Sequence, residues 1–511
     1  MSQEFSANNK RIAKNTLLLY LRSVFLILIN LYTSRVILQA LGVQDYGIYN
    51  VVGGMVTMFT MLSNTMASAS QRFITYALGE RDSDKLKKVF TTSITLHAVL
   101  GFIIILLIES VGVWFLYNKL SIPTERLDVA FWVLQFSIAT LFVNIISVPF
   151  NATIIAHERM SAFAYISILD GVLKLAIAML ILLTSADRLI LYAALMFAVA
   201  LLLRFIYSIY SHRHFEETRH IRLHIEHGLF REMFSFAGWN LFGNGSALLR
   251  NQGIDILLNM FFGVTVNAAK GVSNQVLHAI TQFVQNFQTA VNPQLTMSVA
   301  QSDTQRTHFL IMQGGRFSFF LLCLFVIPLI MVTPQVLSLW LVEVPQWAVE
   351  FIRWTLIYQL WDTLSRFLVT AMLATGEIRN YQIVVGGTKL LAVPMAYVWL
   401  LLGGSPLVGI WVNIILELAC LGLRLYFNAN ANGLRWKTYL TGVVLRCWVV
   451  FVMAIGLSYM IKDYLTSNFI LLIVASLMLT VLSISIIGMD KSERLLVLSK
   501  ASSFISRHRI L

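Results

Sequence analysis

Long apolar segments alternate with short polar loops along the whole chain. Fourteen segments are long enough for the roughly 20 residues that a helix needs to cross the hydrocarbon of a bilayer. The pattern therefore predicts an all-α polytopic membrane protein with about 14 transmembrane helices. The segments are expected near residues 16–40, 46–76, 88–117, 128–156, 161–184, 188–210, 236–262, 265–297, 315–338, 348–374, 381–402, 406–427, 438–461 and 467–488.

An internal duplication relates the first two segments to the seventh and eighth. A shift of 221 residues, as from Gly42 to Gly263, superposes scarce polar positions that chance rarely aligns in lipid-embedded helices. Each copy holds six helices, an even number, so the copies are expected to share one orientation in the membrane. The other matched pairs are Ser23 with Asn244, Asn30 with Asn251, Ser34 with Asp255, Thr57 with His278, Thr60 with Thr281, Asn64 with Gln285, and Gln71 with Asn292.

The duplication predicts four regions. Residues 1–211 form an N-terminal six-helix lobe, and residues 212–234 form a cytoplasmic linker. Residues 235–430 form a C-terminal six-helix lobe. Residues 431–511 add a two-helix pair and a cytoplasmic tail.

Composition and loop charge agree with a membrane protein. Hydrophobic residues make up 58% of the chain and charged residues 12%, against about 45–50% and about 25% in soluble domains. With a cytoplasmic N-terminus, 22 of the 38 Lys and Arg residues fall on the cytoplasmic side, and only Lys119, Arg126, Arg188 and Lys462 fall outside. Positive residues are retained in the cytoplasm, so both termini are expected there. The net charge of +13 follows from this topology rather than from nucleic-acid binding.

Polar residues follow one face of several segments at the helical period of about 100° per residue. Polar groups that find no partner in hydrocarbon are costly, so we interpret these stripes as the lining of a wet cleft between the lobes. Interhelical hydrogen bonding is the alternative for any single amide. The predicted lining is Asn30, Thr57, Asn64, Gln71, Asn244, Asn251, Asn274, His278, Gln285 and Asn292.

Basic residues inside the segments outnumber the acids Glu109, Asp170, Asp255, Asp362 and Glu417. Two acids are expected to pair with a base at i,i+4, Asp170 with Lys174 and Asp362 with Arg366. Four other bases lie close enough to segment ends to reach the interface, namely Arg22, Arg72, Arg204 and Arg424. The remaining excess predicts a cationic cavity for a phosphate or pyrophosphate. The candidate substrate-binding residues are Arg250, Lys270, Lys174, Lys389, Arg35, Arg353 and Arg366, with Asp255 as a candidate for coupling to Na⁺ or H⁺.

Motifs of enzymatic chemistry are not found. The loops are too short for an enzyme domain and hold no nucleotide loop, nucleophile elbow or paired catalytic carboxylates, so neither enzymatic activity nor a cofactor is expected. His220, His224 and His227 have a helical spacing but lack a Cys or a closing carboxylate, so no metal site is expected. Cys323, Cys420 and Cys447 all lie in apolar segments, which argues against disulfides.

Three stretches resemble a known family. They are SRVILQALGVQDYGIYNVVGG at residues 34–54, SASQRF at residues 68–73 and FSFAGWNLFG at residues 234–243. The chain resembles, over about residues 10–430, the bacterial polysaccharide-biosynthesis membrane proteins, the oligosaccharide-lipid (O-antigen type) flippases of the multidrug/oligosaccharidyl-lipid/polysaccharide exporter superfamily.

The resemblance implies two six-helix bundles around a cavity that opens to each side of the bacterial inner membrane in turn. It also implies translocation of undecaprenyl-pyrophosphate-linked oligosaccharide to the outer leaflet for O-antigen or capsule synthesis, with a polysaccharide polymerase and glycosyltransferases as partners. A peptidoglycan-precursor lipid flippase and a cation-coupled multidrug exporter are the alternatives. Against the exporter, no Asp or Glu occurs between Arg11 and Asp45. A scaffold that holds glycosyltransferases at the membrane is a further alternative. It would be expected to have a tightly packed apolar interior, and the polar stripes count against this.

Overall fold

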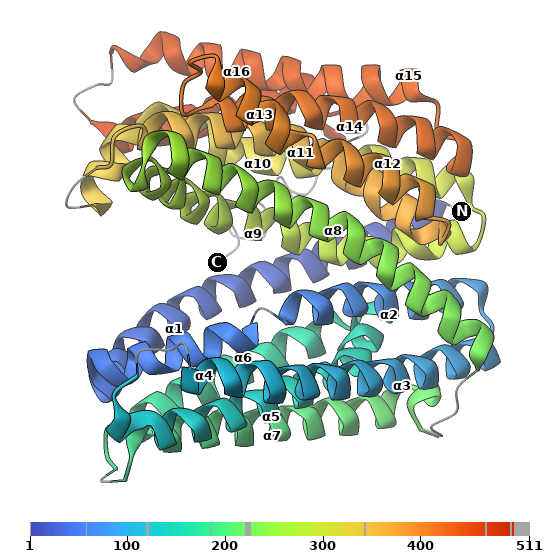
Figure 1. Cartoon of the computed structure of the whole chain (residues 1–511). Helices are drawn as coiled ribbons and strands as arrows, with labels where there is room; N and C mark the ends of the chain where they lie inside the picture. Colours follow the sequence, from blue (N-terminus) through green and yellow to red (C-terminus); the bar gives the residue numbers. More distant parts are fainter. Residues whose placement is uncertain are drawn as a thin grey trace, which may run out of the picture. The chain divides into compact units, whose positions relative to one another are not determined.

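The computed structural model describes residues 2–57, 59–118, 122–184, 186–219, 226–341, 344–464, 468–490 and 493–494. The side chain of Thr57 lies outside the described part, as do His220 and His224. All regular structure in the described ranges is helical, and Figure 1 shows long helices running side by side.

Helices in the first half of the chain largely follow the predicted segments. They are α1 (Ser2–Thr57), α2 (Thr60–Glu80), α3 (Ser83–Leu107), the π-helical turn η1 (Ile108–Gly112), α4 (Val113–Asn118), the short turn η2 (Thr124–Arg126), α5 (Leu127–Ala156), α6 (Met160–Leu180), α7 (Arg188–His214) and the short turn η3 (Glu216–Thr218). The predicted segment 46–76, however, is divided between the end of α1 and α2.

The second half continues with helices of similar length. They are α8 (His227–Phe262), α9 (Val264–Ala300), α10 (Thr304–Trp340), α11 (Ala348–Thr375), α12 (Arg379–Leu390), α13 (Ala392–Leu401), α14 (Val408–Asn432), α15 (Trp436–Tyr439), η4 (Leu440–Leu445), α16 (Arg446–Lys462), α17 (Phe469–Ser483) and η5 (Ile484–Gly488).

Ten helical segments are long and apolar enough to cross a membrane. This number refers to the described residues, and it confirms the predicted all-α, multi-pass class. The other predicted segments, 46–76, 236–262, 265–297 and 348–374, are also largely helical but carry many of the predicted polar and charged positions. The ten segments are Arg11–Gly42, Ser83–Asn118, Thr124–Ala156, Met160–Leu180, Arg188–His214, Thr304–Trp340, Arg379–Leu401, Val408–Asn432, Trp436–Lys462 and Phe469–Gly488.

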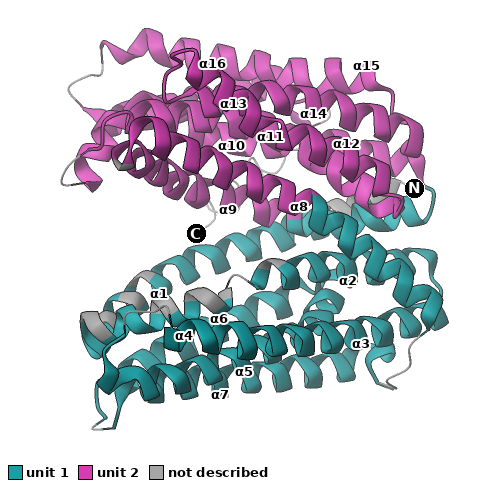
Figure 2. Cartoon of the chain, in the orientation of Figure 1, with its two compact units in different colours: residues 1–242, 289–302 teal, residues 243–288, 303–511 magenta. Residues whose placement is uncertain are grey.

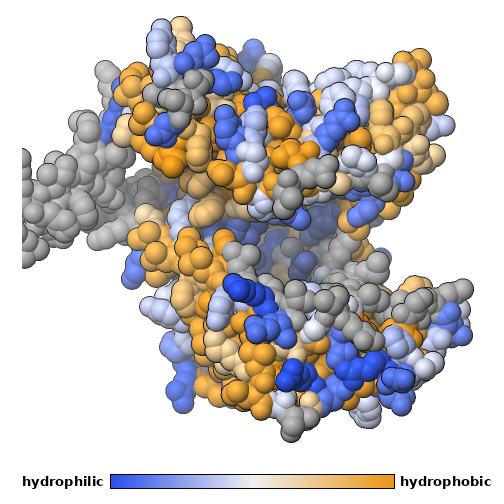
Figure 3. All heavy atoms as spheres, turned by 90° about the vertical axis from the view of Figure 1, so that its left-hand side faces the viewer, coloured by the Kyte–Doolittle hydropathy of each residue, from blue (hydrophilic) through white to orange (hydrophobic). Residues whose placement is uncertain are grey.

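The chain forms two compact units, coloured separately in Figure 2. Unit 1 contains residues 1–242 and 289–302, and unit 2 contains residues 243–288 and 303–511. Helices α8 and α9 are therefore each divided between the two units. Large apolar side chains such as Leu402 and Met460 are exposed, and hydrophobic surface is visible on both units in Figure 3, as expected for proteins that face lipid.

Helix α5 is central to unit 1, where it packs against α1, α2, α3 and α7. Val133, Leu134 and Ile145 of α5 are fully buried in the core of this unit. At the start of α7, the Asp187 carboxylate caps the helix by accepting hydrogen bonds from the Leu189 and Ile190 amides at 3.1 and 3.2 Å. The same carboxylate pairs with Arg126, which also pairs with Asp45 of α1.

The turn between α5 and α6 also ties other elements of unit 1 together. Glu158 adopts a left-handed backbone conformation with φ of 56°, and its side chain is almost fully buried. Its carboxylate lies 2.7 Å from Nε of Arg11 on α1 and accepts a hydrogen bond of 3.3 Å from Gln294 on α9. The beginning of α1 and the end of α9 are thereby fixed to the same loop.

Unit 2 is built around α10, α11 and α14, with α16 and α17 packed against α10. Helix α10 contains Pro328 and Pro334 and departs from helical geometry at Val332, as proline kinks predict. The buried hydroxyl of Tyr439 donates a hydrogen bond of 2.5 Å to the Leu364 carbonyl of α11. This bond fixes the short α15 to the core of the unit.

Two equivalent glycines end equivalent helical stretches. Gly42 has φ of 74° and interrupts α1, and Gly263 has φ of 76° and separates α8 from α9. This left-handed conformation is open to glycine and strained for other L-residues. The 221-residue shift therefore relates the same backbone turn in both halves of the chain.

Candidate functional site

A cluster of charged side chains lies inside unit 2 and is contributed by α8, α9, α11, α12 and α14. Five members are basic and three are acidic, so this set carries an excess of two positive charges. We call it the cationic cluster. Its members are Arg250, Lys270, Arg366, Lys389 and Arg424, with Asp255, Asp362 and Glu417.

Each carboxylate of the cationic cluster is held by one basic side chain. Nζ of Lys270 on α9 lies 2.5 Å from Oδ1 of Asp255 on α8. Arg366 pairs with Asp362 on α11, which confirms that predicted i,i+4 pair. The other predicted pair is also confirmed, because Nζ of Lys174 lies 2.8 Å from Oδ2 of Asp170 in unit 1.

The third pair of the cluster corrects an expectation. Arg424 pairs with Glu417 on α14 and is 1% exposed, so its guanidinium is buried inside the unit and does not extend to the surface. The physical reason is the length of α14, which continues to Asn432, beyond the predicted end of its segment, and leaves Arg424 inside the unit.

Arg250 and Lys389 are the basic members of the cationic cluster that have no described carboxylate within 4.0 Å. Arg250 is 6% exposed, donates to Oδ1 of Asn251 at 3.3 Å and lies 5.7 Å from the ring centre of Tyr358. Lys389 stands at the end of α12, within electrostatic range of Arg250, Asp362 and Glu417.

This arrangement suits an anion. Cations that remain unpaired in an environment of low polarity are costly, and an anionic ligand removes that cost. A guanidinium group beside an ammonium group matches phosphate oxygens, which accept several charge-assisted hydrogen bonds. The positions equivalent to Arg250, Asp255 and Lys270 under the 221-residue shift are Ile29, Ser34 and Tyr49, so the first half of the chain has no charge at these positions.

The other predicted basic residues are distributed over both units. Arg353 is half-buried on α11, with Nε buried and without a hydrogen-bond partner in the described structure. Arg35 is exposed on α1, in unit 1. Lys174 belongs to unit 1 as well, in the pair with Asp170.

The predicted polar lining is also divided between the units. Asn30, Asn64, Gln71 and Asn292 belong to unit 1, whereas Asn244, Asn251, Asn274, His278 and Gln285 belong to unit 2. All the members from unit 2 are exposed, and so are Asn30 and Asn64. Their exposure means that these side chains are not buried in the core of a helical bundle.

Besides Arg424, sequence reasoning missed a neighbour of the cationic cluster. Tyr358 lies against Arg250, and no prediction included it. Its signal was the spacing of Tyr358, Asp362 and Arg366 at i, i+4 and i+8, which places all three on one face of α11.

Solved structures of membrane transporters share the fold of this chain. A structure described as MATE in complex with MaD3S is 13% identical, with a TM-score of 0.71 over 83% of this chain and 96% of that chain. An outward-facing multidrug resistance MATE family transporter of the MOP superfamily is 12% identical, with a TM-score of 0.70 over the same shares. A MOP superfamily transporter from Pyrococcus furiosus, whose binding pocket is described as reversed in polarity, is 12% identical, with a TM-score of 0.69 over 83% of this chain and 96% of that chain.

No curated protein matches the chain. The family model described as "Polysaccharide biosynthesis protein" matches residues 12–301, which is more than half of the chain. The chain belongs to the polysaccharide biosynthesis protein family and has the fold of the MATE transporters of the MOP superfamily.

Proposed function

We propose that this protein is a flippase that moves undecaprenyl-pyrophosphate-linked oligosaccharide units from the cytoplasmic to the outer leaflet of the bacterial inner membrane. The units then serve the synthesis of a surface polysaccharide such as O-antigen or capsule, together with a polymerase and glycosyltransferases. Membership of the polysaccharide biosynthesis family supports the substrate class.

The observation that carries the proposal is the excess of positive charge in the cationic cluster. Pyrophosphate is the anionic part of a lipid-linked sugar, and its transfer through a membrane requires that protein groups replace its lost hydration. Arg250 and Lys389, which have no carboxylate of their own, are the first contacts that we assign. Further contacts in this proposal come from Lys270, Lys174, Arg35, Arg353 and Arg366.

Transport follows alternating access in this proposal. Fourteen helices form two six-helix lobes, residues 1–211 and 235–430, joined by the linker 212–234 and followed by the helical pair and tail of residues 431–511, with both termini in the cytoplasm. The polar side chains predicted to line the cleft hydrate the sugar as the lobes rock. Asp255 couples the movement to Na⁺ or H⁺, because a cation that binds its carboxylate competes with Lys270.

A multidrug exporter on the same fold is the main rival. A site for cationic drugs needs carboxylates that are not already neutralised. Four of the five acids inside the predicted segments, Asp170, Asp255, Asp362 and Glu417, are ion-paired, which favours an anionic substrate. The fifth, Glu109, accepts a hydrogen bond of 3.1 Å from Gln135. A peptidoglycan-precursor flippase would use the same pyrophosphate chemistry, and only the sugar that is transported separates it from our proposal.

The test is reconstitution of the purified protein in liposomes. A polyprenyl-pyrophosphate oligosaccharide is added to one leaflet, and a membrane-impermeant probe measures its arrival in the other. We expect faster arrival than in empty vesicles. Because each charge-assisted hydrogen bond is worth about 1.5–3 kcal/mol, Lys389→Gln should slow the rate at least about tenfold.

Lys437→Gln is the matched control, since Lys437 is exposed on α15 and lies outside the cationic cluster. Lys389→Gln and Lys437→Gln variants that translocate equally fast would show that the cluster does not bind the headgroup. No acceleration by the wild type with any sugar donor or ion gradient would reject the flippase itself.

A further inference from the structure

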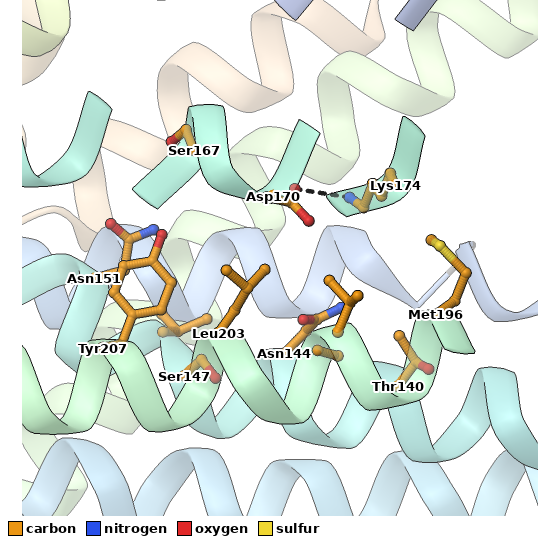
Figure 4. A pocket seen from close by; sticks show the side chains of 13 residues that line it. Thr140, Asn144, Ser147, Asn151, Ser167, Asp170, Lys174, Met196, Leu203 and Tyr207 are labelled. Carbon is orange, nitrogen blue, oxygen red and sulfur yellow. Dashed lines mark hydrogen bonds and ion pairs between the residues drawn. The ribbon is translucent and has the colours of Figure 1, made fainter. Parts of the chain in front are cut away.

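Unit 1 contains a cavity of about 350 Å³ between α5, α6 and α7, shown in Figure 4. Its size falls in the range of about 300–1,000 Å³ that is typical of small-molecule sites. All of its lining residues belong to unit 1. It is therefore separate from the cationic cluster, which lies in unit 2.

A polar stripe of α5 forms one wall of the cavity. Thr140, Asn144, Ser147 and Asn151 stand at i, i+4, i+7 and i+11, which places them on one face of the helix. The sequence contains this spacing, but the predicted polar lining did not include these four residues. In Figure 4 the Asn151 amide and the Tyr207 hydroxyl of α7 point toward α6, which carries Ser167.

The Ser and Thr hydroxyl groups that line the cavity can accept hydrogen bonds from a ligand but already use their own hydrogen. Thr140, Ser147 and Ser167 each donate to the backbone carbonyl four residues earlier, at 2.7 Å. Their remaining lone pairs are left to accept hydrogen bonds. Oδ1 of Asn151 is buried and has no hydrogen-bond partner in the described structure, which leaves a costly polar atom for a ligand to satisfy.

The charge of the cavity is balanced, unlike that of the cationic cluster. Its only charged lining residues are Asp170 and Lys174, which pair with each other. Arg22 approaches Tyr207 from α1, but its guanidinium lies over the Phe163 ring at 4.7 Å, and Arg22 is not part of the lining. A ligand of this cavity therefore needs no net charge.

Apolar side chains line the cavity as well. Met196, Val199 and Leu203 of α7 contribute to the lining together with the polar residues of α5. A sugar ring has this mixed character, because its hydroxyl groups donate to acceptors and its C–H faces pack on apolar groups. A purely apolar ligand would leave the amides unsatisfied, and an anion would meet the Asp170 carboxylate.

We propose that this cavity binds one neutral sugar ring of the lipid-linked oligosaccharide, with Asn144, Asn151 and Asp170 as its hydrogen-bond partners. This inference rests on the proposed function. It adds a sugar site in unit 1 to the pyrophosphate contacts, of which the first that we assign, Arg250 and Lys389, belong to unit 2.

A cysteine reporter tests occupancy of the cavity without requiring transport. Cys323, Cys420 and Cys447 are buried, so they contribute little labelling. Ser147→Cys places a thiol in the lining, and Ser485→Cys is its control, because the Ser485 hydroxyl makes the same i−4 bond on an exposed turn of unit 2. The probes are a series of undecaprenyl pyrophosphates that each carry one neutral hexose or N-acetylhexosamine, and undecaprenyl pyrophosphate without sugar.

We expect at least one sugar-bearing probe to slow labelling of Ser147→Cys by a thiol reagent about tenfold. The sugarless lipid should leave that labelling unchanged, and Ser485→Cys should be labelled equally in all cases. Equal protection by the sugarless lipid, protection of both cysteines, or no protection by any probe would overturn the sugar site.

Translocation rates then separate this inference from the proposed function. Asn144→Leu should slow the sugar-bearing lipid about tenfold and leave the sugarless lipid unchanged, whereas Lys389→Gln should slow both. Asn118→Leu, on an exposed turn of α4, is the control and should behave as the wild type. If Asn144→Leu slows both lipids equally, the cavity does not select sugar even though the protein is a flippase.

Discussion

At the residue scale, the pair of Lys270 and Asp255 is the ion pair of the cationic cluster that joins two helices, α8 and α9. Lys270 is 15% exposed and Asp255 37% exposed. Removal of one partner leaves the other charge poorly solvated, so single variants should lose more stability than the double variant. We expect a coupling of about 1 kcal/mol between Lys270→Gln and Asp255→Asn, measured by thermal unfolding in detergent.

The double variant also shows which outcome would contradict this prediction. If the losses of the two single variants simply add, the two side chains do not interact in the folded protein, and the competition proposed for ion coupling at Asp255 has no basis. The Asp170–Lys174 pair of unit 1 offers a comparison within one helix.

Contacts of the cluster at i,i+4 within one helix could be predicted from the sequence, whereas contacts between two helices could not. The pairs at i,i+4 followed from helical geometry alone, because one turn fixes both side chains. The contacts of Lys270 with Asp255 and of Arg250 with Tyr358 depend on how neighbouring helices are rotated about their axes. A hydrophobic pattern as uniform as that of a membrane protein leaves this rotation weakly specified.

At the element scale, Gly263 forms the turn from α8 to α9 with a left-handed backbone. Gly263→Ala should destabilise the protein by about 1 kcal/mol, because a Cβ atom disfavours this conformation. The measurement is the midpoint of thermal unfolding in detergent.

Gly271→Ala is the matched control for that variant. Gly271 lies within α9, and a Cβ atom there would meet no atom within 4 Å. Alanine favours helix over glycine, so this variant should be as stable as the wild type or more stable. A Cβ atom at Gly263 also meets no atom within 4 Å, so steric conflict cannot explain a difference between the variants. Equal stability of Gly263→Ala and Gly271→Ala would contradict the cost assigned to the left-handed conformation.

Arg126 joins the beginnings of α5 and α7 to α1 through Asp187 and Asp45. Burial raises the pKa of Asp187, but the hydrogen bond from the Ile190 amide and the Arg126 guanidinium together hold this pKa below its ordinary value of 3.8. A carboxylate with a lowered pKa stabilises the fold above its ordinary pKa, and this stability is lost as the pH falls through the folded value.

We therefore expect the wild type to lose thermal stability below about pH 4, and Arg126→Gln to lose less over the same range. The variant should be less stable at pH 6, and the two curves should converge in acid. Parallel curves between about pH 6 and pH 3 would show that Arg126 does not set the titration of Asp187.

The positions of the helices were easier to predict than their ends. Apolar length located the segments, since every predicted segment overlaps helical structure among the described residues, although 46–76 and 381–402 are each divided between two helices. Helix α14 continues past the apolar run to Asn432, where Gly433 ends it with a left-handed φ of 67°. Hydropathy does not detect a polar helical extension, and this is why Arg424 was expected near the membrane interface.

At the scale of the whole molecule, the two halves keep a common backbone pattern and differ in charge. Gly42 and Gly263 repeat the same turn, whereas neutral Ile29 and Tyr49 correspond to Arg250 and Lys270. The duplication was visible in the sequence because polar residues are rare in such helices. The cavity of unit 1 was not predicted, since its walls come from three helices and only Lys174 among its lining residues had been a candidate.

The division of α8 and α9 between the units has a mechanical consequence. The chain passes from one unit to the other at three points, between residues 242 and 243, 288 and 289, and 302 and 303. The first two points lie inside continuous helices, and the third follows Ser302, whose φ is 55°. If the units rotate against each other as we propose for transport, α8 and α9 must both bend or twist, and the stiffness of these two helices then contributes to the energy that the movement requires.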